Sequence, residues 1–113
     1  MKYAFLLYED ERLWETMAEE DRMALIQQHM AYAGALADAG KLVAGEPLEP
    51  TKTARTLKAG AVADGPYADT KEQLGGFYVI EAADEAEALD WARKCPLIDG
   101  GTLEIRTIPD YGG

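Results

Sequence analysis

YAFLLY, residues 3–8, is apolar on both of its alternating faces. A strand with two apolar faces is usually covered on both sides, so these residues predict a buried strand within a sheet. Three acidic residues follow directly, at positions 9–11, and end the strand. An apolar run this short cannot cross a membrane, which excludes a transmembrane helix at this position.

The next long element is a helix that we expect to run from Glu19 to about Ala39, with Gly40 just past its end and a short helical turn over 13–17 before it. At about 100° per residue, its wheel has the wide apolar face that is typical of a helix lying on a sheet. The centre of this face is Met23, Ile26, Met30, Ala33 and Ala37, flanked by Leu25, Tyr32 and Leu36. His29 falls within the same face, so we expect it to point towards the sheet.

The remaining elements follow from alternation and from turn signals. We expect strands over 41–48, 53–57, 60–63, 77–82 and 102–108, a helical turn over 70–73, and a second helix that ends near Cys95. Asp84 is the expected N-cap of that helix, with Glu87 as its capping-box partner. The order gives two βαβ halves with an inserted hairpin. It predicts an α+β, ferredoxin-like split βαβ fold as a single domain over residues 1–113, with both helices on one sheet face.

The other face of the predicted sheet would be bare, yet several strands carry apolar or aromatic side chains on both faces. A second copy of the chain packed on the bare face would remove these side chains from water. We therefore expect a homodimer with facing sheets, in the manner of a dimeric α+β barrel.

The charge balance narrows the classes of partner. The chain has 21 acidic and 11 basic residues and a formal net charge of −10. Such a surface repels phosphate backbones, so we expect no nucleic-acid partner, and no segment predicts a membrane association. Cys95 is the single cysteine and cannot form an internal disulfide, which indicates a reducing, cytoplasmic location.

Several kinds of site are excluded by residue type. One histidine and one cysteine give no zinc constellation. Gly75-Gly76 lacks the spacing of a phosphate-binding loop. The chain contains no serine, so a serine nucleophile is excluded. We therefore expect no cofactor and no metal.

Five blocks of the sequence resemble one family. They are MKYAFLLYE at 1–9, VAGEPL at 43–48, DGPY at 64–67, TKEQLGGFY at 70–78 and TLEIR at 102–106. In this order they resemble the YCII-related proteins, in particular the branch named for an Asp-Gly-Pro-Phe motif. Tyr67 replaces the phenylalanine of that motif, which keeps the ring and adds a hydroxyl. The resemblance implies a ferredoxin-like dimer with a His and Asp pair near a pocket, but it implies no substrate.

His29 and Asp64 are the candidate catalytic pair. His29 is the only histidine, and its ordinary pKa lies near neutrality. Partial burial on the helix would favour the neutral base form. The alternative is a packed histidine that is hydrogen-bonded to a backbone carbonyl. Asp64 would either orient His29 or simply cap the Asp-Gly-Pro turn, and the pair requires the two side chains to be within hydrogen-bond reach.

A second set of polar residues could hold a ligand. Lys71 and Glu72 precede two glycines that allow close approach of the backbone, although an exposed ion pair is the commoner role for such charges. Four further candidates lie in or near strands, where each could line a pocket or belong to a dimer interface: Tyr8, Glu46, Tyr78 and Arg106. Glu46 and Arg106 could also form an ion pair with each other.

These residues lead to a main hypothesis and two alternatives. The main hypothesis is a small, cofactor-free enzyme in which His29, oriented by Asp64, transfers a proton to or from a small aromatic or anionic molecule. The first alternative is a ligand-binding or regulatory dimer without turnover. The second is a protein partner in sigma-factor regulation, which the resemblance alone suggests, because members of this branch are often encoded beside sigma factors.

Overall fold

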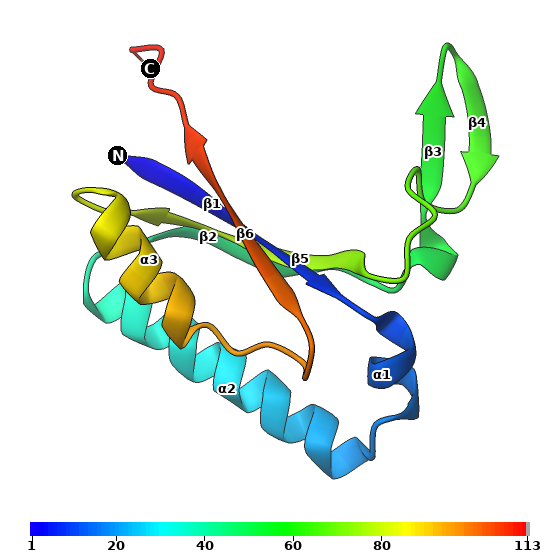
Figure 1. Cartoon of the computed structure of the whole chain (residues 1–113), viewed down its shortest axis with the longest axis horizontal. Coiled ribbons are helices and arrows are strands. Elements are labelled where there is room, and N and C mark those ends of the chain that lie inside the picture. The colour runs from blue at the N-terminus through cyan, green and yellow to red at the C-terminus, as the bar shows by residue number, and fades with distance from the viewer. Residues whose placement is uncertain (113) are drawn as a thin grey trace.

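Ten elements follow one another along the chain in the computed structural model, which describes residues 1–112 (Figure 1). They are β1 (Lys2–Glu9), α1 (Glu11–Thr16), α2 (Glu19–Asp38), β2 (Leu42–Pro47), the 3₁₀ turn η1 (Thr51–Thr53), β3 (Arg55–Lys58), β4 (Ala61–Asp64), β5 (Gln73–Glu81), α3 (Glu85–Lys94) and β6 (Thr102–Ile108). The α+β class is confirmed. No helix among residues 1–112 is both long enough and apolar enough to cross a membrane.

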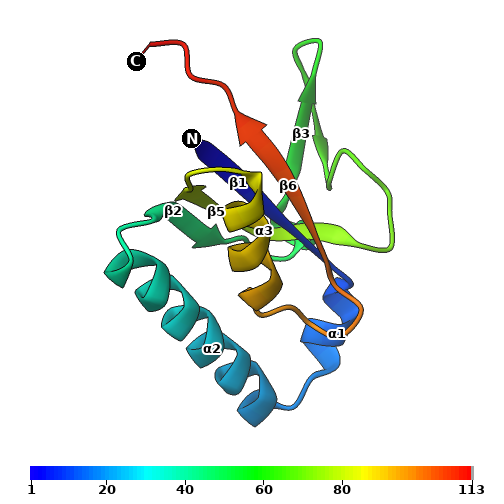
Figure 2. The ribbon, with the colours of Figure 1, turned by 60° about the vertical axis from the view of Figure 1, so that its left-hand side comes forward.

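Four strands form one antiparallel sheet in the order β2-β5-β1-β6. β1 is central, and Phe5 pairs with Tyr78 on one side and with Ile105 on the other. This order places β5 between β1 and β2, as a split βαβ arrangement requires. Both α2 and α3 lie on the same face of the sheet (Figures 1 and 2). The predicted topology is therefore present in the single chain.

The core lies between this sheet face and the two long helices. Tyr3, Phe5 and Leu7 alternate along β1 and are almost fully buried, and Ile80 on β5 is fully buried with them. Leu36 of α2 fills the space above them and is also fully buried. The apolar strand at 3–8 is thus covered by helices on its odd-numbered face. Its other face is not covered by a helix of residues 1–112, so within one chain only half of the expected cover is present (Figure 1).

The rotation of α2 differs from the expectation. Tyr32 and Leu36 are buried, whereas Met23, Ile26 and Met30 are 50%, 40% and 69% exposed. Tyrosine and leucine bury more apolar area than the alanines of the expected face, so the helix gains more by turning them inwards. The Tyr32 hydroxyl also donates a hydrogen bond of 2.7 Å to the carbonyl oxygen of Trp91 on α3. The predicted direction of His29 is retained, because it lies on the same stripe as Tyr32.

Two local expectations need correction. Asp84 caps α3 by accepting from the Glu87 amide at 2.9 Å. The Glu87 carboxylate, however, accepts from the amide of Ala83 instead of that of Asp84, and it also binds the Lys41 ammonium at 2.8 Å. The helical turn expected over 70–73 does not form, because the segment bends and β5 already begins at Gln73.

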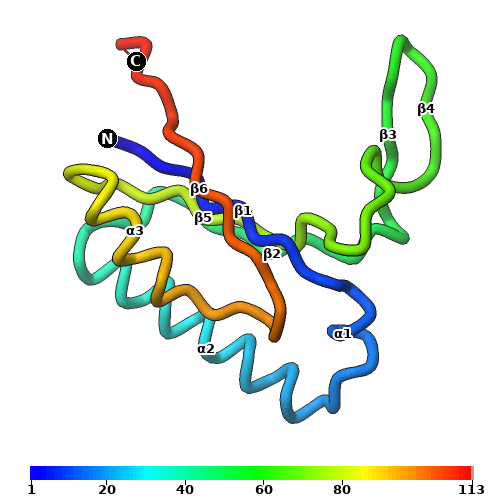
Figure 3. The backbone as a smooth tube through the Cα atoms, in the orientation of Figure 1, coloured from blue at the N-terminus to red at the C-terminus, as the bar shows by residue number. Residues whose placement is uncertain are grey.

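The inserted hairpin forms as expected but is separate from the four-stranded sheet. β3 pairs only with β4, from Arg55 opposite Asp64 to Lys58 opposite Ala61. The chain leaves the end of β2, runs through the hairpin and returns to start β5 (Figure 3). The hairpin stands away from the body of the molecule, on the side of the sheet opposite to the helices (Figures 1 and 2).

Candidate functional site

A cavity of about 570 Å³ opens at the end of the sheet that is remote from the termini. Its walls are the middle of α2, the end of β1, the start of β5, α1, and the segment from Gly45 to Pro50. Apolar and aromatic side chains form most of the lining, among them Trp14, Leu25, Ile26, Met30 and Leu48. A volume of this size and an apolar lining are typical of a site for a small organic molecule.

His29 lies in the wall of this cavity, and Tyr78 fixes its ring. Nδ1 of His29 is 2.8 Å from the Tyr78 hydroxyl oxygen. The two rings are stacked with centroids 6.0 Å apart and planes 17° apart. Tyr32 meets Tyr78 edge-on at 5.2 Å, so an aromatic group supports the partner of His29 from behind. The structure gives Nε2 of His29 no hydrogen-bond partner within residues 1–112.

Burial sets the protonation states of this pair. Loss of hydration lowers the pKa of His29 below its ordinary 6.5. Burial, with a smaller contribution from nearby Cys95, raises the pKa of Tyr78 to about 12. At neutral pH the imidazole is therefore uncharged and the phenol keeps its proton. A neutral phenol can donate to Nδ1 or accept from Nδ1–H, so it supports either tautomer of the imidazole.

Gly45 on β2 makes room for Tyr78. The two residues pair across the sheet, and a Cβ at Gly45 would lie 2.7 Å from Cδ1 of the tyrosine ring. No side chain fits at that distance. The glycine within the second strand thus allows the ring to lie flat against β2, where its hydroxyl reaches His29.

Asp64 does not reach His29 within one chain. It lies on β4, where its side chain is 90% exposed and 3.2 Å from Nε of Arg55. It does not line the cavity that contains His29. In the single chain, the residue that orients His29 is therefore Tyr78, which the sequence suggested only as a ligand-binding group.

The other candidate residues divide between two hollows. Glu46 and Tyr78 line the His29 cavity. Tyr8, Lys71 and Glu72 line a second hollow of about 670 Å³ at the ends of β1 and β6. Within one chain, Glu46 and Arg106 do not form the ion pair that was one alternative for them, because β2 and β6 are opposite edges of the sheet.

Arg106 belongs to neither hollow. It lies 3.9 Å from Glu104 on its own strand. The two side chains are largely exposed, so this contact adds little stability.

Glu9 is a cavity residue that the sequence interpretation missed. In the sequence it is one of three acidic residues that end the first strand, but Glu9 is half-buried in the cavity wall, and burial raises the pKa of its carboxyl above 4.5. Alternation along β1 could have found it, because Glu9 follows the inward-facing Phe5 and Leu7 at the same two-residue spacing.

The charged residues in the cavity lining are all acidic. Glu9, Glu11, Glu46 and Glu49 line it, and no lysine or arginine does so. Glu11 is already engaged, since its two oxygens accept from the amide and the hydroxyl of Thr51 at 2.7 Å. No group of three or more potential metal ligands converges anywhere in residues 1–112. The lining therefore favours a ligand that carries no negative charge.

Comparison with known proteins agrees with the blocks of resemblance in the sequence. The sequence profile of the YCII-related domain matches residues 1–111. An uncharacterized protein of Rhizobium meliloti (strain 1021) is 38% identical over 117 aligned residues, which cover 98% of this chain and 94% of that protein. The chain belongs to the YCII-related domain family.

Proposed function

We propose that this protein is a small enzyme in which His29 transfers a proton to or from a small aromatic molecule held in the cavity beside α2. One observation carries the proposal: a neutral, half-buried imidazole lines an apolar cavity, and its Nδ1 is held 2.8 Å from the Tyr78 hydroxyl. A positioned histidine of this kind is the commonest general acid or base in enzymes.

Tyr78 gives the proposed base its direction. When the proton of the neutral imidazole is on Nδ1 and is donated to the Tyr78 oxygen, the lone pair of Nε2 is free to accept a proton from a ligand. The resulting imidazolium keeps the same hydrogen bond through Nδ1–H. The imidazolium can then return the proton from Nε2–H to the ligand and become neutral again. One geometry thus serves proton removal and proton return.

The lining supports an aromatic ligand and argues against an anionic one. Trp14 and Tyr78 offer ring surfaces for stacking. Four glutamates on the wall would repel a carboxylate or phosphate. Of the two ligand classes that the sequence suggested, we therefore propose the aromatic one, with a neutral or positively charged polar group.

The unit that we propose is a homodimer. Leu6 pairs with Phe77 and Ala4 pairs with Val79 on the sheet face that lies away from the helices. No helix of residues 1–112 covers this face (Figure 1). Glu104 on the edge strand β6 pairs with Leu6. A charged side chain therefore lies at the border of the apolar centre, as in many protein–protein interfaces. Facing sheets of two copies, in a dimeric α+β barrel, would bury this centre.

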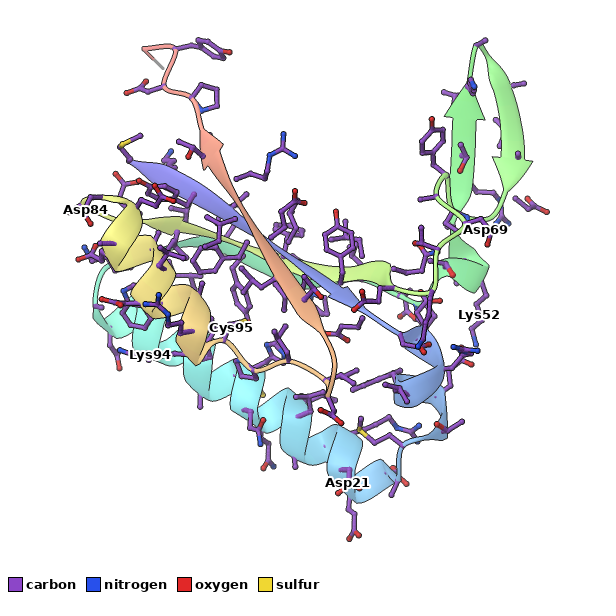
Figure 4. All side chains as sticks on the ribbon, in the orientation of Figure 1. Asp21, Lys52, Asp69, Asp84, Lys94 and Cys95 are labelled. Carbon is purple, nitrogen blue, oxygen red and sulfur yellow. The ribbon has the colours of Figure 1, made fainter. Side chains whose placement is uncertain are left out.

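We further propose a cytoplasmic location. Cys95 is a free, buried cysteine where α3 ends (Figure 4). Burial raises the pKa of its thiol to about 12, so the thiol is inert at neutral pH, and its state agrees with a reducing compartment.

The base-catalysed ring opening of nitrobenzisoxazole tests the proposed enzyme. In this reaction a base removes the proton on carbon, the N–O bond breaks and a coloured cyanonitrophenolate forms. The probe is neutral, aromatic and small enough for the cavity. We expect the wild type to accelerate it with a rate that increases with pH as His29 loses its proton, below the midpoint of free histidine. His29→Gln should abolish the acceleration, whereas Gln27→Ala on the exposed side of α2 should retain it.

Equal rates for the wild type and His29→Gln would refute His29 as the base. Saturable binding of the probe without any acceleration would instead support the alternative of a ligand-binding module without turnover. Analytical ultracentrifugation tests the assembly separately, and a monomer at micromolar concentration would refute the homodimer.

A further inference from the structure

The β3–β4 hairpin carries apolar side chains that its own chain does not cover. Leu57 and Val62 pair across the two strands, yet they are 69% and 68% exposed. Tyr67, three residues beyond the end of β4, is 82% exposed. A two-stranded hairpin without a packing partner is at best marginally stable in water. The hairpin therefore carries an apolar pair, Leu57 and Val62, that requires a surface outside its own chain to pack against.

The charge of the hairpin is opposite to that of the rest of the chain. Residues 51–64 contain Lys52, Arg55 and Lys58 and one acidic residue, Asp64, a charge of +2. The remaining residues hold the other 8 basic and 20 acidic side chains, a charge of −12. Lys52 lies at the foot of the hairpin (Figure 4). The surface that best complements this segment is therefore the acidic body of another copy of the same chain.

The direction and length of the hairpin also fit a second copy. The hairpin projects on the side of the uncovered sheet face (Figures 1 and 2). Two sheets packed face to face lie about 10 Å apart, and a four-residue strand spans about 14 Å. The hairpin is thus long enough to pass the plane of a facing sheet.

The hairpin would enlarge an interface formed by the sheet face. A standard stable interface buries about 800 Å² of accessible surface on each partner. The exposed side chains of Leu57 and Val62 would add to that buried surface on the same side of the sheet.

We propose that the β3–β4 hairpin is an arm that binds a second copy of this chain, with Leu57 and Val62 packed on it and Lys58 facing its acidic surface. This inference rests on the proposed homodimer and deepens it. In a two-fold symmetric dimer each copy contributes one arm, so every arm contact occurs twice. The arm also carries Asp64 and Arg55, and it therefore delivers the Asp-Gly-Pro turn to the partner's surface.

The double variant Leu57→Glu with Val62→Glu tests the arm, because both side chains point into solvent in the single chain and the fold of the monomer does not depend on them. We expect the association constant to fall about tenfold for each arm, and thus about a hundredfold for the dimer. Met23→Glu is the control, since it replaces an exposed apolar side chain on the helix side of the sheet by one of the two glutamates that the double variant adds. Sedimentation equilibrium of the three proteins at equal ionic strength measures the effect.

A dimeric wild type whose double variant associates equally tightly would overturn the arm and leave the homodimer intact. A monomeric wild type would overturn both. Cross-linking of amines to carboxylates in a mixture of ¹⁴N- and ¹⁵N-labelled protein gives a second test. Cross-links from Lys52 or Lys58 should join peptides of different isotopes, and cross-links found only within one isotope would refute the arm.

Discussion

Replacing Gly45 by alanine should displace the tyrosine that holds His29. The new Cβ would lie 2.7 Å from Cδ1 of Tyr78, so the ring must move by about 0.7 Å to reach the 3.4 Å of an ordinary contact. The ring cannot move freely, because Tyr32 packs edge-on against it and His29 is bound to its hydroxyl. Overpacking of this kind costs about 1–3 kcal/mol. We expect a loss of that size together with a weaker His29–Tyr78 contact.

Gly34→Ala is the matched control. Gly34 lies in the interior of α2, and no atom lies within 4 Å of its added Cβ. Alanine in place of glycine within a helix stabilises by about 1 kcal/mol, so the two substitutions should have opposite signs. Urea denaturation at one fixed protein concentration measures both, because dimerisation would make stability depend on concentration. A Gly45→Ala protein as stable as Gly34→Ala would refute the packing of Tyr78 against β2.

Three further outcomes follow from the burial and capping of particular groups. Because burial lowers the pKa of His29 below 6.5, the unfolded chain binds this proton at a higher pH than the folded chain, and the free energy of unfolding should fall as pH drops below about 6.5. His29→Gln should reduce the difference in unfolding free energy between denaturation curves at about pH 7.5 and about pH 5.5. An unchanged difference would contradict this role of His29. Because burial raises the pKa of Glu9 above 4.5, the ionised carboxylate destabilises the folded state above that pH. Glu9→Gln should therefore stabilise the protein more at neutral pH than at about pH 4. The exposed Glu20→Gln should show no such difference. Asp84→Ala removes the cap on the Glu87 amide and should cost about 1 kcal/mol in thermal unfolding; a neutral effect would show that α3 does not depend on this cap.

The order of elements could be predicted because it rests on local patterns. The alternation over 102–108 predicts the bounds of β6, and the long helix expected from about Glu19 is α2. The rotation of α2 could not be predicted in this way. It depends on Tyr32, whose hydroxyl partner lies 59 residues away in sequence, and no helical wheel includes that contact.

The candidate site was predictable in part for the same reason. His29 was found because histidine is unique in this chain and lies on the apolar face that the helical wheel predicts. Its orienting residue was not, because Tyr78 reaches Nδ1 only through the pairing of β5 with β1 and β2. The position of Asp64 depends on the direction in which the hairpin leaves the sheet. No local sequence pattern predicts that direction.

The nitrogen NMR spectrum of the His29 ring, recorded across pH with and without added phenol, tests the site most directly. His29 is the only histidine, so its two ring nitrogens need no assignment against other residues. We predict a midpoint below 6.5, an Nδ1 signal that changes in Tyr78→Phe, and a phenol-dependent shift of Nε2 that benzoate does not produce. A free-histidine midpoint with ring signals indifferent to both Tyr78→Phe and phenol would contradict the proposal that His29 and Tyr78 form the functional site.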